Sequence, residues 1–298
     1  MKRNIVKARS ELLATIRLFF TNRGFSEVTT PRVDREIIPE AHIDPYQVDD
    51  LGYLQASPEM HMKRLLCAGS GPIFEIATCF RRGERGRLHR PEFTMIEWYR
   101  PGHTMQAGMF LLDELIQHTL QTSPAKSISY RDAFRCSGVK VDPHTVSIDE
   151  LKLFAPNFDC NDRDELLNYV LAKFVEPRMG EKTPELLYHY PASQSALAST
   201  TLDDQGQEVA ERFELYYRGI ELANGYHELT APVELRRRLT EANAVRESDG
   251  RPRLPLPERL LSDMTTPGLP PCSGVALGFD RLLMLAVGAD SLDEVCVN

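Results

Sequence analysis

The sequence predicts an α+β fold in which helices flank a mostly antiparallel sheet. Strand-like runs at residues 52–57, 73–80 and 92–100 follow one another closely, and the last two are joined by a polar loop at 81–91, which indicates a hairpin with a long charged tip. Helical runs lie before and after these strands and form no βαβ repeat with them. The chain also lacks the GxGxxG and GxxxxGK(S/T) motifs, so neither a Rossmann nor a P-loop site is expected.

The N-terminal part of the chain predicts a helix followed by an edge segment. Over residues 5–20 the apolar side chains recur at helical spacing, and Gly24 follows as a stop signal. Residues 25–33 are rich in β-branched side chains but contain Pro31, which lacks the N–H group that a central strand needs. We therefore expect this segment at the edge of a sheet or at an interface.

The middle of the chain is less regular. Residues 103–120 predict a helix. Residues 122–179 alternate polar loops with a short helix near 164–174, and we interpret them as an insertion of little chemical content within a single domain that spans 1–298. No catalytic residue is expected in this segment.

The last third of the chain returns to strands. Strand character is found at residues 186–190 and 212–229, and a charged helix is expected over 232–247. A proline-rich connection then leads to a final strand and helix over 274–287. Together with the hairpin, these strands complete the predicted sheet.

Composition restricts the classes of function. The 298 residues are 42% hydrophobic and 26% charged, which fits one large globular domain with room for a deep cleft. The net charge of −8 disfavours a broad attraction to nucleic-acid backbones. The six cysteines show neither CxxC nor Cys/His metal spacing, so we expect no disulfide framework and no zinc site, and a reducing cytoplasm is the expected location. Charged residues interrupt the first 20 positions, so no signal or membrane segment is expected there.

A basic loop is the most informative feature. The stretch 80–100 reads FRRGERGRLHRPEFTMIEWYR and places six basic residues between two apolar strands. A solvated hairpin tip is the plain interpretation of such a loop. Glu84 and Glu92 among the arginines, together with Phe93, Trp98 and Tyr99 on the returning strand, favour instead an anion site with aromatic walls. The basic residues are Arg81, Arg82, Arg85, Arg87, His89 and Arg90.

A second feature is the acidic stretch 211–229, where Glu214, Glu221 and Glu228 lie seven residues apart. A charged helical stripe is the plain alternative, but Gly219 and Gly225 would each cost a helix interior about 1 kcal/mol. On a single strand this odd spacing puts successive carboxylates on opposite faces, so convergence would require bulges, which we expect at the two glycines. Converging oxygens would bind Mg²⁺ bridging ATP phosphates, while another glutamate pairs with a substrate ammonium.

A third feature is the stretch 272–283, CSGVALGFDRLL, in which Gly274 and Gly278 lie on a short apolar strand before a helix with Arg281. Small residues also serve close packing between a strand and a helix, so this pattern alone decides little. Together with the other two features, this stretch indicates that a flat nucleotide base can approach the backbone at the glycines. It also indicates that Arg281 can bind the γ-phosphate.

These three features resemble motifs 2 and 3 of class II aminoacyl-tRNA synthetases, and Thr29-Thr30-Pro31 resembles the proline-bearing motif 1 of that class. Within the class, the chain is similar to lysyl-tRNA synthetases over nearly its whole length. The matching stretches are SPE at 57–59, KRL at 63–65, the run 89–99, ELANGYHEL at 221–229 and GFDR at 278–281.

One difference narrows the resemblance. Lysyl-tRNA synthetases carry an N-terminal OB-fold domain that reads the anticodon, whereas here the similarity to the catalytic core begins almost at Met1, so no anticodon-binding domain is expected. The chain looks like the stand-alone paralogue family of elongation factor P (R)-β-lysine ligases. That resemblance implies a ligase that uses ATP and Mg²⁺, takes (R)-β-lysine or lysine, and acts on a lysine of elongation factor P. It also implies a homodimer built on motif 1, with tRNA an unlikely partner.

The resemblance further implies a role for each matching residue of the nucleotide site. Arg81 would hold the substrate carboxylate and the α-phosphate, and adenine would stack between Phe93 and Arg281, so Arg81 and Arg281 are the expected catalytic residues. The expected ATP-binding set is Arg81, Arg82, Gly83, Glu84, Arg90, Phe93, Glu221, Leu222, Gly278 and Arg281.

At the amino-acid end, the resemblance implies that Glu59 meets the backbone-side amino group and that Tyr99 and Glu228 meet the distal ammonium. Glu214 and Glu221 would ligate Mg²⁺. The expected substrate-binding set is Ser57, Pro58, Glu59, Tyr99, Asn224, Glu228 and Ala276. Adenylate formation would follow by in-line attack of the carboxylate on the α-phosphate.

Three departures from the lysyl pattern stand out. Gly83 displaces Glu84 by one position from the usual Phe-Arg-x-Glu arrangement, and Arg90 stands where an asparagine is usual. The pattern Gly-Leu-Gly-Ile-Gly reads Gly-Val-Ala-Leu-Gly here, with Ala276 at its centre. The methyl group of Ala276 would reshape the wall near the amino end of the substrate, disfavouring α-lysine and accommodating a β-amino group.

Two alternatives remain open at this stage. One is an enzyme that transfers lysine to tRNA or to a small acceptor. The other is a non-catalytic regulatory module that kept the fold, although such a module has no need of a metal-binding acidic pair.

Overall fold

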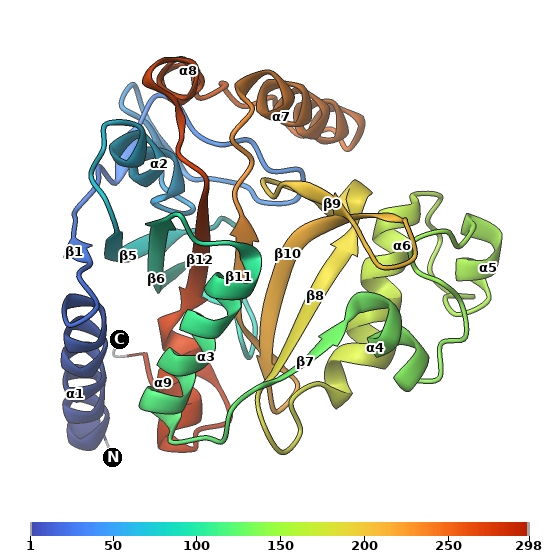
Figure 1. The fold of residues 1–298 in the computed structure, drawn as a ribbon, viewed down its shortest axis with the longest axis horizontal. Helices are drawn as coiled ribbons and strands as arrows, with labels where there is room; N and C mark the ends of the chain where they lie inside the picture. Colours follow the sequence, from blue (N-terminus) through green and yellow to red (C-terminus); the bar gives the residue numbers. More distant parts are fainter. Residues whose placement is uncertain (1, 297–298) are drawn as a thin grey trace. The chain divides into compact units, whose positions relative to one another are not determined.

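The computed structural model describes residues 2–296 and divides into two compact units (Figure 1). The first unit contains the chain up to Thr104 and again from Leu229 onward, and the second contains Met105–Glu228. Both units combine helices with mainly antiparallel strands, so the predicted α+β class is confirmed. None of the described helices combines the length and the apolar character needed to cross a membrane.

The sheet of the first unit is built on the predicted hairpin. Strands β5 (Ile73–Phe80) and β6 (Glu92–Pro101) pair antiparallel, and β12 (Cys272–Gly278) pairs antiparallel with the other side of β6. The short strand β1 (Ser26–Glu27) runs parallel to β5 at the outer edge, as the proline in this segment predicts. A separate small sheet has the order β2 (Val33–Asp34), β4 (Gly52–Leu54), β3 (Gln47–Val48).

Helices complete the first unit. Helix α1 (Lys2–Thr21) covers the predicted range, and its buried Phe20 stacks on Phe74 of β5 and lies 5.0 Å from Trp98 of β6 between ring centroids. The predicted strand at 52–57 ends early, at Leu54, because α2 (Glu59–Cys67) follows. This helix was not predicted from the sequence. The remaining helical segments are α7 (Pro232–Ser248), α8 (Glu258–Asp263), η4 (Met264–Gly268), α9 (Phe279–Val287) and η5 (Leu292–Glu294).

The second unit also contains strands. Its strands follow the order β11 (Ile220–His227), β10 (Glu208–Tyr217), β8 (Glu185–Pro191), β7 (Lys126–Ser129), and β9 (Thr200–Leu202) also pairs with β10. The pairs of β10 are antiparallel, whereas β7 runs parallel to β8. The helical segments are α3 (Met105–Leu120), α4 (Tyr130–Cys136), α5 (Ile148–Lys152), α6 (Arg163–Val170), η1 (Leu171–Val175), η2 (Glu176–Arg178) and η3 (Ala192–Gln194).

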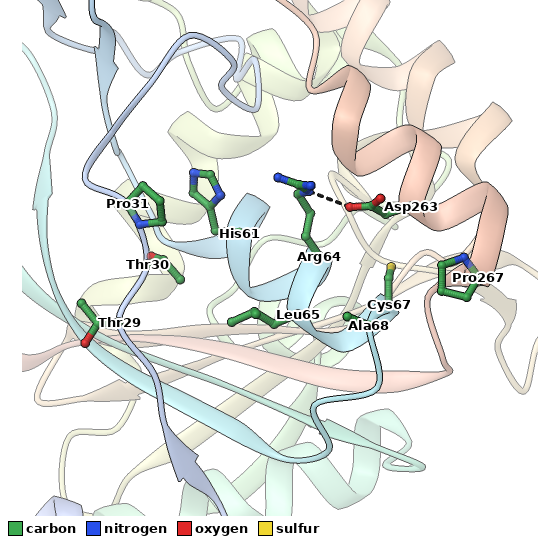
Figure 2. A pocket seen from close by; sticks show the side chains of 10 residues that line it. All are labelled: Thr29, Thr30, Pro31, His61, Arg64, Leu65, Cys67, Ala68, Asp263 and Pro267. Carbon is green, nitrogen blue, oxygen red and sulfur yellow. Dashed lines mark hydrogen bonds and ion pairs between the residues drawn. The ribbon is translucent and has the colours of Figure 1, made fainter.

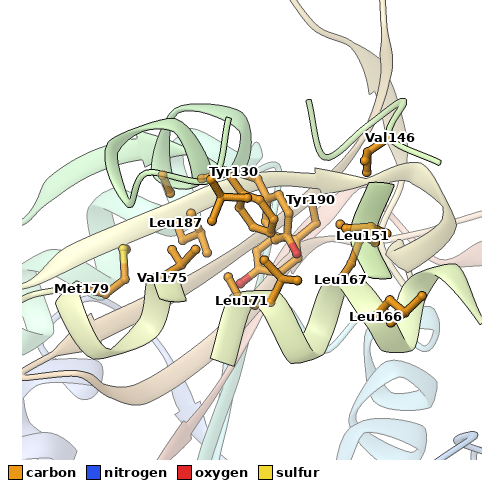
Figure 3. Close-up of a cluster of buried hydrophobic side chains, with 14 of the residues drawn as sticks. Tyr130, Val146, Leu151, Leu166, Leu167, Leu171, Val175, Met179, Leu187 and Tyr190 are labelled. Atoms are coloured by element: carbon orange, nitrogen blue, oxygen red, sulfur yellow. The ribbon is translucent and has the colours of Figure 1, made fainter. Parts of the chain in front are cut away.

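Residues 122–179 are more regular than the sequence analysis predicted. Beside the predicted helix near 164–174, they form β7, α4 and α5. Their apolar side chains join those of β8 and β10 in one buried cluster, in which Tyr130 packs on Tyr190 with ring centroids 4.7 Å apart (Figure 3). The short helices α4 and α5 were hard to recognise because they have only three buried residues and one, respectively.

Candidate active site

The basic loop starts where β5 ends. The backbone N–H of Arg81 donates to the carbonyl of Pro91 at 2.9 Å across the base of the loop. The guanidinium carbon of Arg81 lies 5.1 Å from the ring centroid of Phe93, and its Nη1 lies 3.8 Å from a carboxylate oxygen of Glu84. Its Nε is buried and has no hydrogen-bond partner among the described residues. A guanidinium with an unused, buried donor is suited to bind an anion.

The tip of the loop is held by the C-terminal part of the same unit. Arg281, in the first turn of α9, donates through Nε to the carbonyl of Leu88 at 3.1 Å, and its Nη2 lies 2.9 Å from Nε2 of His89. The backbone N–H of Leu292 donates to the carbonyl of Arg87 at 3.0 Å. Burial and then the positive charge of Arg281 lower the pKa of His89, so its neutral ring accepts from the guanidinium at pH 7.

The other predicted loop residues have contacts within the protein. The backbone N–H of Arg82 donates to the carbonyl of Asp44 at 2.7 Å, and Gly83 turns the chain at a φ of 83°. Arg90 forms an ion pair with Asp293 in η5. The side chain of Arg90 therefore ties the loop to η5, and this contact would have to be shared or exchanged for a phosphate to bind there.

One face of this sheet gathers several predicted residues. Side chains alternate between the two faces of a strand, so Phe93, Glu97 and Tyr99 of β6 share one face. Ala276 of β12 lies directly opposite Glu97, and Gly274 lies opposite Tyr99. Directly paired residues of antiparallel strands point to the same side, so the predicted aromatic and substrate-binding positions lie along one floor.

An acidic cluster, formed by Glu59 and Glu97 with Ser57, Lys63 and Tyr99, lies at one end of this floor. Ser57 donates to one carboxylate oxygen of Glu97 at 2.5 Å, and the Tyr99 hydroxyl donates to the other at 2.6 Å. Lys63 of α2 donates to Glu59 at 2.6 Å, and the backbone N–H of Glu59 donates to the Ser57 hydroxyl at 3.1 Å. The structure thus brings together three predicted substrate-binding residues and adds Glu97 and Lys63 to them.

Glu97 is the residue that sequence reasoning missed. Its side chain is 2% exposed, and burial raises its pKa from 4.5 to about 8, with the charge of Glu59 as the next cause. A carboxyl so strongly shifted marks a candidate functional site. The signal in the sequence was a glutamate between Ile96 and Trp98, in the apolar middle of the strand, where burying a charge is costly.

The remaining predicted residues of this unit lie at element boundaries. Pro58 precedes the first turn of α2, and Gly278 stands between β12 and α9. A small cavity of about 30 Å³ borders Ser57 and Glu59. Pro58 and Gly278 therefore lie at junctions between elements, where the backbone can approach a ligand.

The acidic stretch of the second unit forms a hairpin, which corrects the expectation of a single bulged strand. Glu214 lies on β10 and Glu221 on β11, and the chain reverses at Arg218 and Gly219, both with positive φ. The register shift between these strands lies at Leu215/Tyr216, not at a glycine. The hairpin brings Glu221 opposite Tyr216, so the two glutamates approach by chain reversal rather than through a bulge at each glycine.

Gly225 has a different role from the predicted bulge. It pairs with Phe213, whose ring is fully buried, and a Cβ added at Gly225 would lie 2.4 Å from Cζ of that ring. Only glycine leaves room for the aromatic ring at this position. The residue therefore serves packing.

Glu214 is surrounded by hydrogen-bond donors. Arg212 donates to one carboxylate oxygen at 2.6 Å, and the Tyr216 hydroxyl donates to the other at 2.5 Å. Arg212 also reaches the carbonyl of Gln194 at 3.1 Å and the Oδ1 of Asn224 at 3.3 Å. Arg212, which no sequence pattern singled out, thus links a predicted metal ligand to a predicted substrate-binding residue.

The carboxylates of the hairpin fit a partial Mg²⁺ site. Each oxygen of Glu214 accepts one protein hydrogen bond and keeps a second lone pair. Glu214 and Glu221 can supply one oxygen ligand each, and Mg²⁺ bound with a nucleotide takes the rest from phosphates and water. Among residues 2–296, no group of three or more His, Cys, Asp and Glu side chains is placed to hold a metal ion by itself. The predicted residues Leu222 and Glu228 are buried, at 2% and 1% exposure.

The predicted residues thus fall into two sets. Arg81, Phe93 and Arg281 belong to the first unit, and Glu214 and Glu221 belong to the second. Their meeting around one nucleotide stays a prediction.

A separate cavity of about 410 Å³ lies in the first unit beside α2 (Figure 2). Arg64 donates to Asp263 at 2.6 Å across one wall, and the segment of motif 1 forms the opposite wall. None of the predicted ATP-binding or substrate-binding residues lines it. The lining residues are Thr29, Thr30, Pro31, His61, Arg64, Leu65, Cys67, Ala68, Asp263 and Pro267.

Comparison with known proteins gives a consistent result. The family described as tRNA synthetases class II (D, K and N) matches residues 1–297. Proteins named elongation factor P (R)-β-lysine ligase from Salmonella dublin, Salmonella gallinarum and Salmonella paratyphi B are each 44% identical to this chain over 308 aligned positions, which cover 98% of this chain and 93% of the relative.

Proposed function

The chain belongs to the class II tRNA synthetase family (D, K and N), and on that premise we propose that it is an ATP-dependent ligase that activates (R)-β-lysine, or lysine, as an aminoacyl-adenylate. In the second step it transfers the aminoacyl group to a lysine side chain of elongation factor P. The names of the 44% identical relatives support this acceptor. One observation carries the proposal: a single sheet face has the Arg81–Phe93 pair at one end and the buried Glu97 at the other.

The acidic cluster supports a substrate with an ammonium group. Glu59 already has a cationic partner in Lys63, at 2.6 Å. The two groups that donate to Glu97 are neutral hydroxyls, and the charge of Lys63 lowers the pKa of Glu97 less than burial raises it. A substrate ammonium that enters beside Glu97 would add a positive charge and stabilise the carboxylate. Every amino acid brings one such ammonium, so the choice of a lysine-like substrate rests on the names of the relatives.

Arg81 supports the activation step at the other end of the floor. Its buried Nε and its position over Phe93 suit it to hold the substrate carboxylate and the α-phosphate beside a stacked base. A carboxylate oxygen then attacks the α-phosphorus in line, the P–O bond to the leaving group breaks, and pyrophosphate departs. Arg81 neutralises charge that develops on the phosphate oxygens. Glu214 and Glu221 would hold Mg²⁺, which would supply positive charge to the phosphates of a bound nucleotide.

The transfer step uses the reactive adenylate. The neutral Nζ amine of the acceptor lysine attacks the carbonyl carbon, AMP leaves with the electron pair of the broken C–O bond, and the extra proton passes to solvent. An amide remains on elongation factor P. The protein needs only to align the two groups, because the adenylate is already activated.

Ala276 supports a preference for the β-amino acid. It lies directly opposite Glu97 in the strand register and packs against the cluster of Ala77, Cys79 and Met95. Its methyl group fills space on the substrate floor that a glycine would leave open. We assign it to selection between the two lysine isomers.

The decisive experiment supplies purified protein with Mg-ATP and either (R)-β-lysine or α-lysine and follows pyrophosphate exchange. A second reaction includes elongation factor P, whose intact mass reports the addition. We expect exchange with (R)-β-lysine and one added residue on the acceptor. The Arg81→Ala variant should lose exchange, and Arg85→Ala, at the exposed tip of the same loop, serves as its matched control. Wild-type protein with neither exchange nor transfer would refute the proposal.

Transfer to tRNA is the second candidate, and the matching family of tRNA synthetases favours it. The net charge of −8 weighs against it. Labelled lysine appearing on bulk tRNA faster than on elongation factor P would decide for tRNA.

Two further properties belong to this proposal. We propose a homodimer, because the segment that resembles motif 1 carries Pro31 beside the edge strand β1, and light scattering would measure its mass. We also propose a cytoplasmic location. All six cysteines lie within the described chain as free thiols, which suits a reducing compartment.

A further inference from the structure

A closed ring of hydrogen bonds joins three distant parts of the first unit. Arg9 of α1 donates through Nη1 to Asp280 Oδ1 at 2.6 Å and through Nη2 to the Thr94 hydroxyl at 2.6 Å. The backbone N–H of Thr94 donates to the other oxygen of Asp280 at 2.7 Å. The Arg9 guanidinium also lies 4.8 Å from the ring centroid of Phe279. We propose that Arg9 is a positioning residue for the nucleotide site.

The residues next to the ring in the sequence are the reason for assigning Arg9 this role. Thr94 follows Phe93 in β6, and Asp280 precedes Arg281 in α9. Phe93 and Arg281 are the two residues between which adenine is proposed to stack, so the inference rests on the proposed function. Arg9 contacts both Thr94 and Asp280, so it holds the strand that carries Phe93 to the helix that carries Arg281.

The ring acts from outside the site. Successive side chains of a strand point to opposite faces, so Thr94 points away from the face that carries Phe93. Arg9 and Asp280 therefore hold the walls from behind and have no direct contact to make with a nucleotide. The side chain of Asp280 is 6% exposed and that of Arg9 is 28% exposed, so water competes weakly for the ion pair at the Asp280 end.

The geometry of the ring is specific to arginine. Two nitrogens of one planar guanidinium reach two acceptors on different elements, which a single ammonium cannot do with the same fixed geometry. A general role in fastening α1 to the unit is the competing explanation. The same helix offers a matched control for it, because Arg17 forms an ion pair with Glu27 at 3.0 Å, with both side chains exposed.

The test compares Arg9→Met and Arg9→Lys with Arg17→Met. Binding of Mg-ATP to each purified variant is measured by calorimetry without an amino acid, and binding of lysine is measured without ATP. We expect Arg9→Met to weaken ATP binding about ten-fold or more, because Asp280 loses its cation and the two walls keep only the hydrogen bond from the Thr94 N–H to Asp280. Arg9→Lys should fall between this variant and the wild type. Lysine binding should change by less than about two-fold in every variant, and ATP binding should be unchanged in Arg17→Met.

A second variant protects the test against misfolding. Thr94→Val keeps the size of the side chain and removes only one acceptor of the ring. If Arg9→Met does not fold, Thr94→Val decides the question. A selective loss of ATP affinity in Thr94→Val would support the inference, and an unchanged ATP affinity would overturn it. Equal loss of ATP and lysine binding in Arg9→Met would show a general structural role and overturn the inference.

Failure of the inference is distinct from failure of the proposed function. Wild-type protein that binds ATP but transfers nothing would refute the ligase proposal and leave the ATP-binding comparison valid. Wild-type ligase activity with normal ATP affinity in Arg9→Met would refute the positioning role alone.

Discussion

Replacing Glu97 by glutamine tests the acidic cluster most directly. Burial raises the pKa of this carboxyl to about 8 in the folded protein, against 4.5 as the ordinary value. Between these two values the unfolded chain has lost its proton while the folded protein keeps it. The folded state then binds more protons, so the free energy of unfolding falls as the pH rises from about 4.5 to about 8. Below 4.5 both states are protonated and the effect is absent.

The size of the effect follows from the shift. At about 1.4 kcal/mol per pKa unit, the full shift corresponds to at most about 5 kcal/mol. Glu97→Gln removes the ionisable group and keeps hydrogen-bonding atoms for Ser57 and Tyr99. We expect the variant to match the parent in urea unfolding at pH 5 and to be more stable than the parent at pH 8.

Substrate binding should also depend on the ionisation of Glu97. With a pKa of about 8, roughly nine-tenths of the Glu97 carboxyls are protonated at pH 7. An entering ammonium favours the ionised form, so lysine binding should release close to one proton. Calorimetry in two buffers of different ionisation enthalpy measures this release. Loss of a charged hydrogen bond worth about 1.5–3 kcal/mol should weaken lysine binding by the variant on the order of 10- to 150-fold.

Glu75 provides the matched control for this prediction. It lies directly opposite Glu97 on β5, burial also raises its pKa, and it accepts hydrogen bonds from the backbone N–H of Thr30 at 3.1 and 3.2 Å. Glu75→Gln should change proton release and lysine affinity much less than Glu97→Gln, because the backbone N–H of Thr30 already holds the carboxylate of Glu75. If Glu97→Gln binds lysine as tightly as the parent and releases as many protons, the carboxylate is not the partner of the ammonium and the reasoning fails.

Three further predictions concern other contacts. Gly225→Ala would place a Cβ 2.4 Å from the buried ring of Phe213, and this overpacking should cost about 1–3 kcal/mol in urea unfolding; a change below about 0.5 kcal/mol would show that the ring moves aside easily. Arg212→Met leaves the carboxylate of Glu214 without its cation and should lower stability by about 3 kcal/mol. Adding Glu214→Gln to that variant should restore part of the loss, and strict additivity in the double-mutant cycle would contradict the pairing. Ala276→Gly should raise exchange with α-lysine relative to (R)-β-lysine, and an unchanged ratio of kcat/KM values for the two isomers would remove this residue from isomer selection.

Local patterns in the sequence determined the elements. The spacing of apolar residues predicted α1, β5 and β6 to within a few residues, and Pro31 predicted the edge position of its segment. These signals succeed because helical and strand periodicities depend on residues only a few positions apart. The motif-like stretches also indicated the family, which the comparison confirms. The same local reasoning failed where one acidic run forms two strands, because a reversal at Arg218 and Gly219 breaks the period within a single stretch.

Tertiary structure decided which side chains lie together. Ser57 reaches Glu97 across 40 positions and Arg9 reaches Asp280 across 271, and no spacing rule relates residues so far apart. The shift of the Glu97 pKa likewise comes from burial and from Glu59, neither of which a strand pattern displays. A sequence specifies the chemistry that each residue carries, but desolvation and long-range contacts arise only when the chain has packed. For that reason the partners of Glu97 and Arg9, and the roles proposed for them, emerged only from the folded protein.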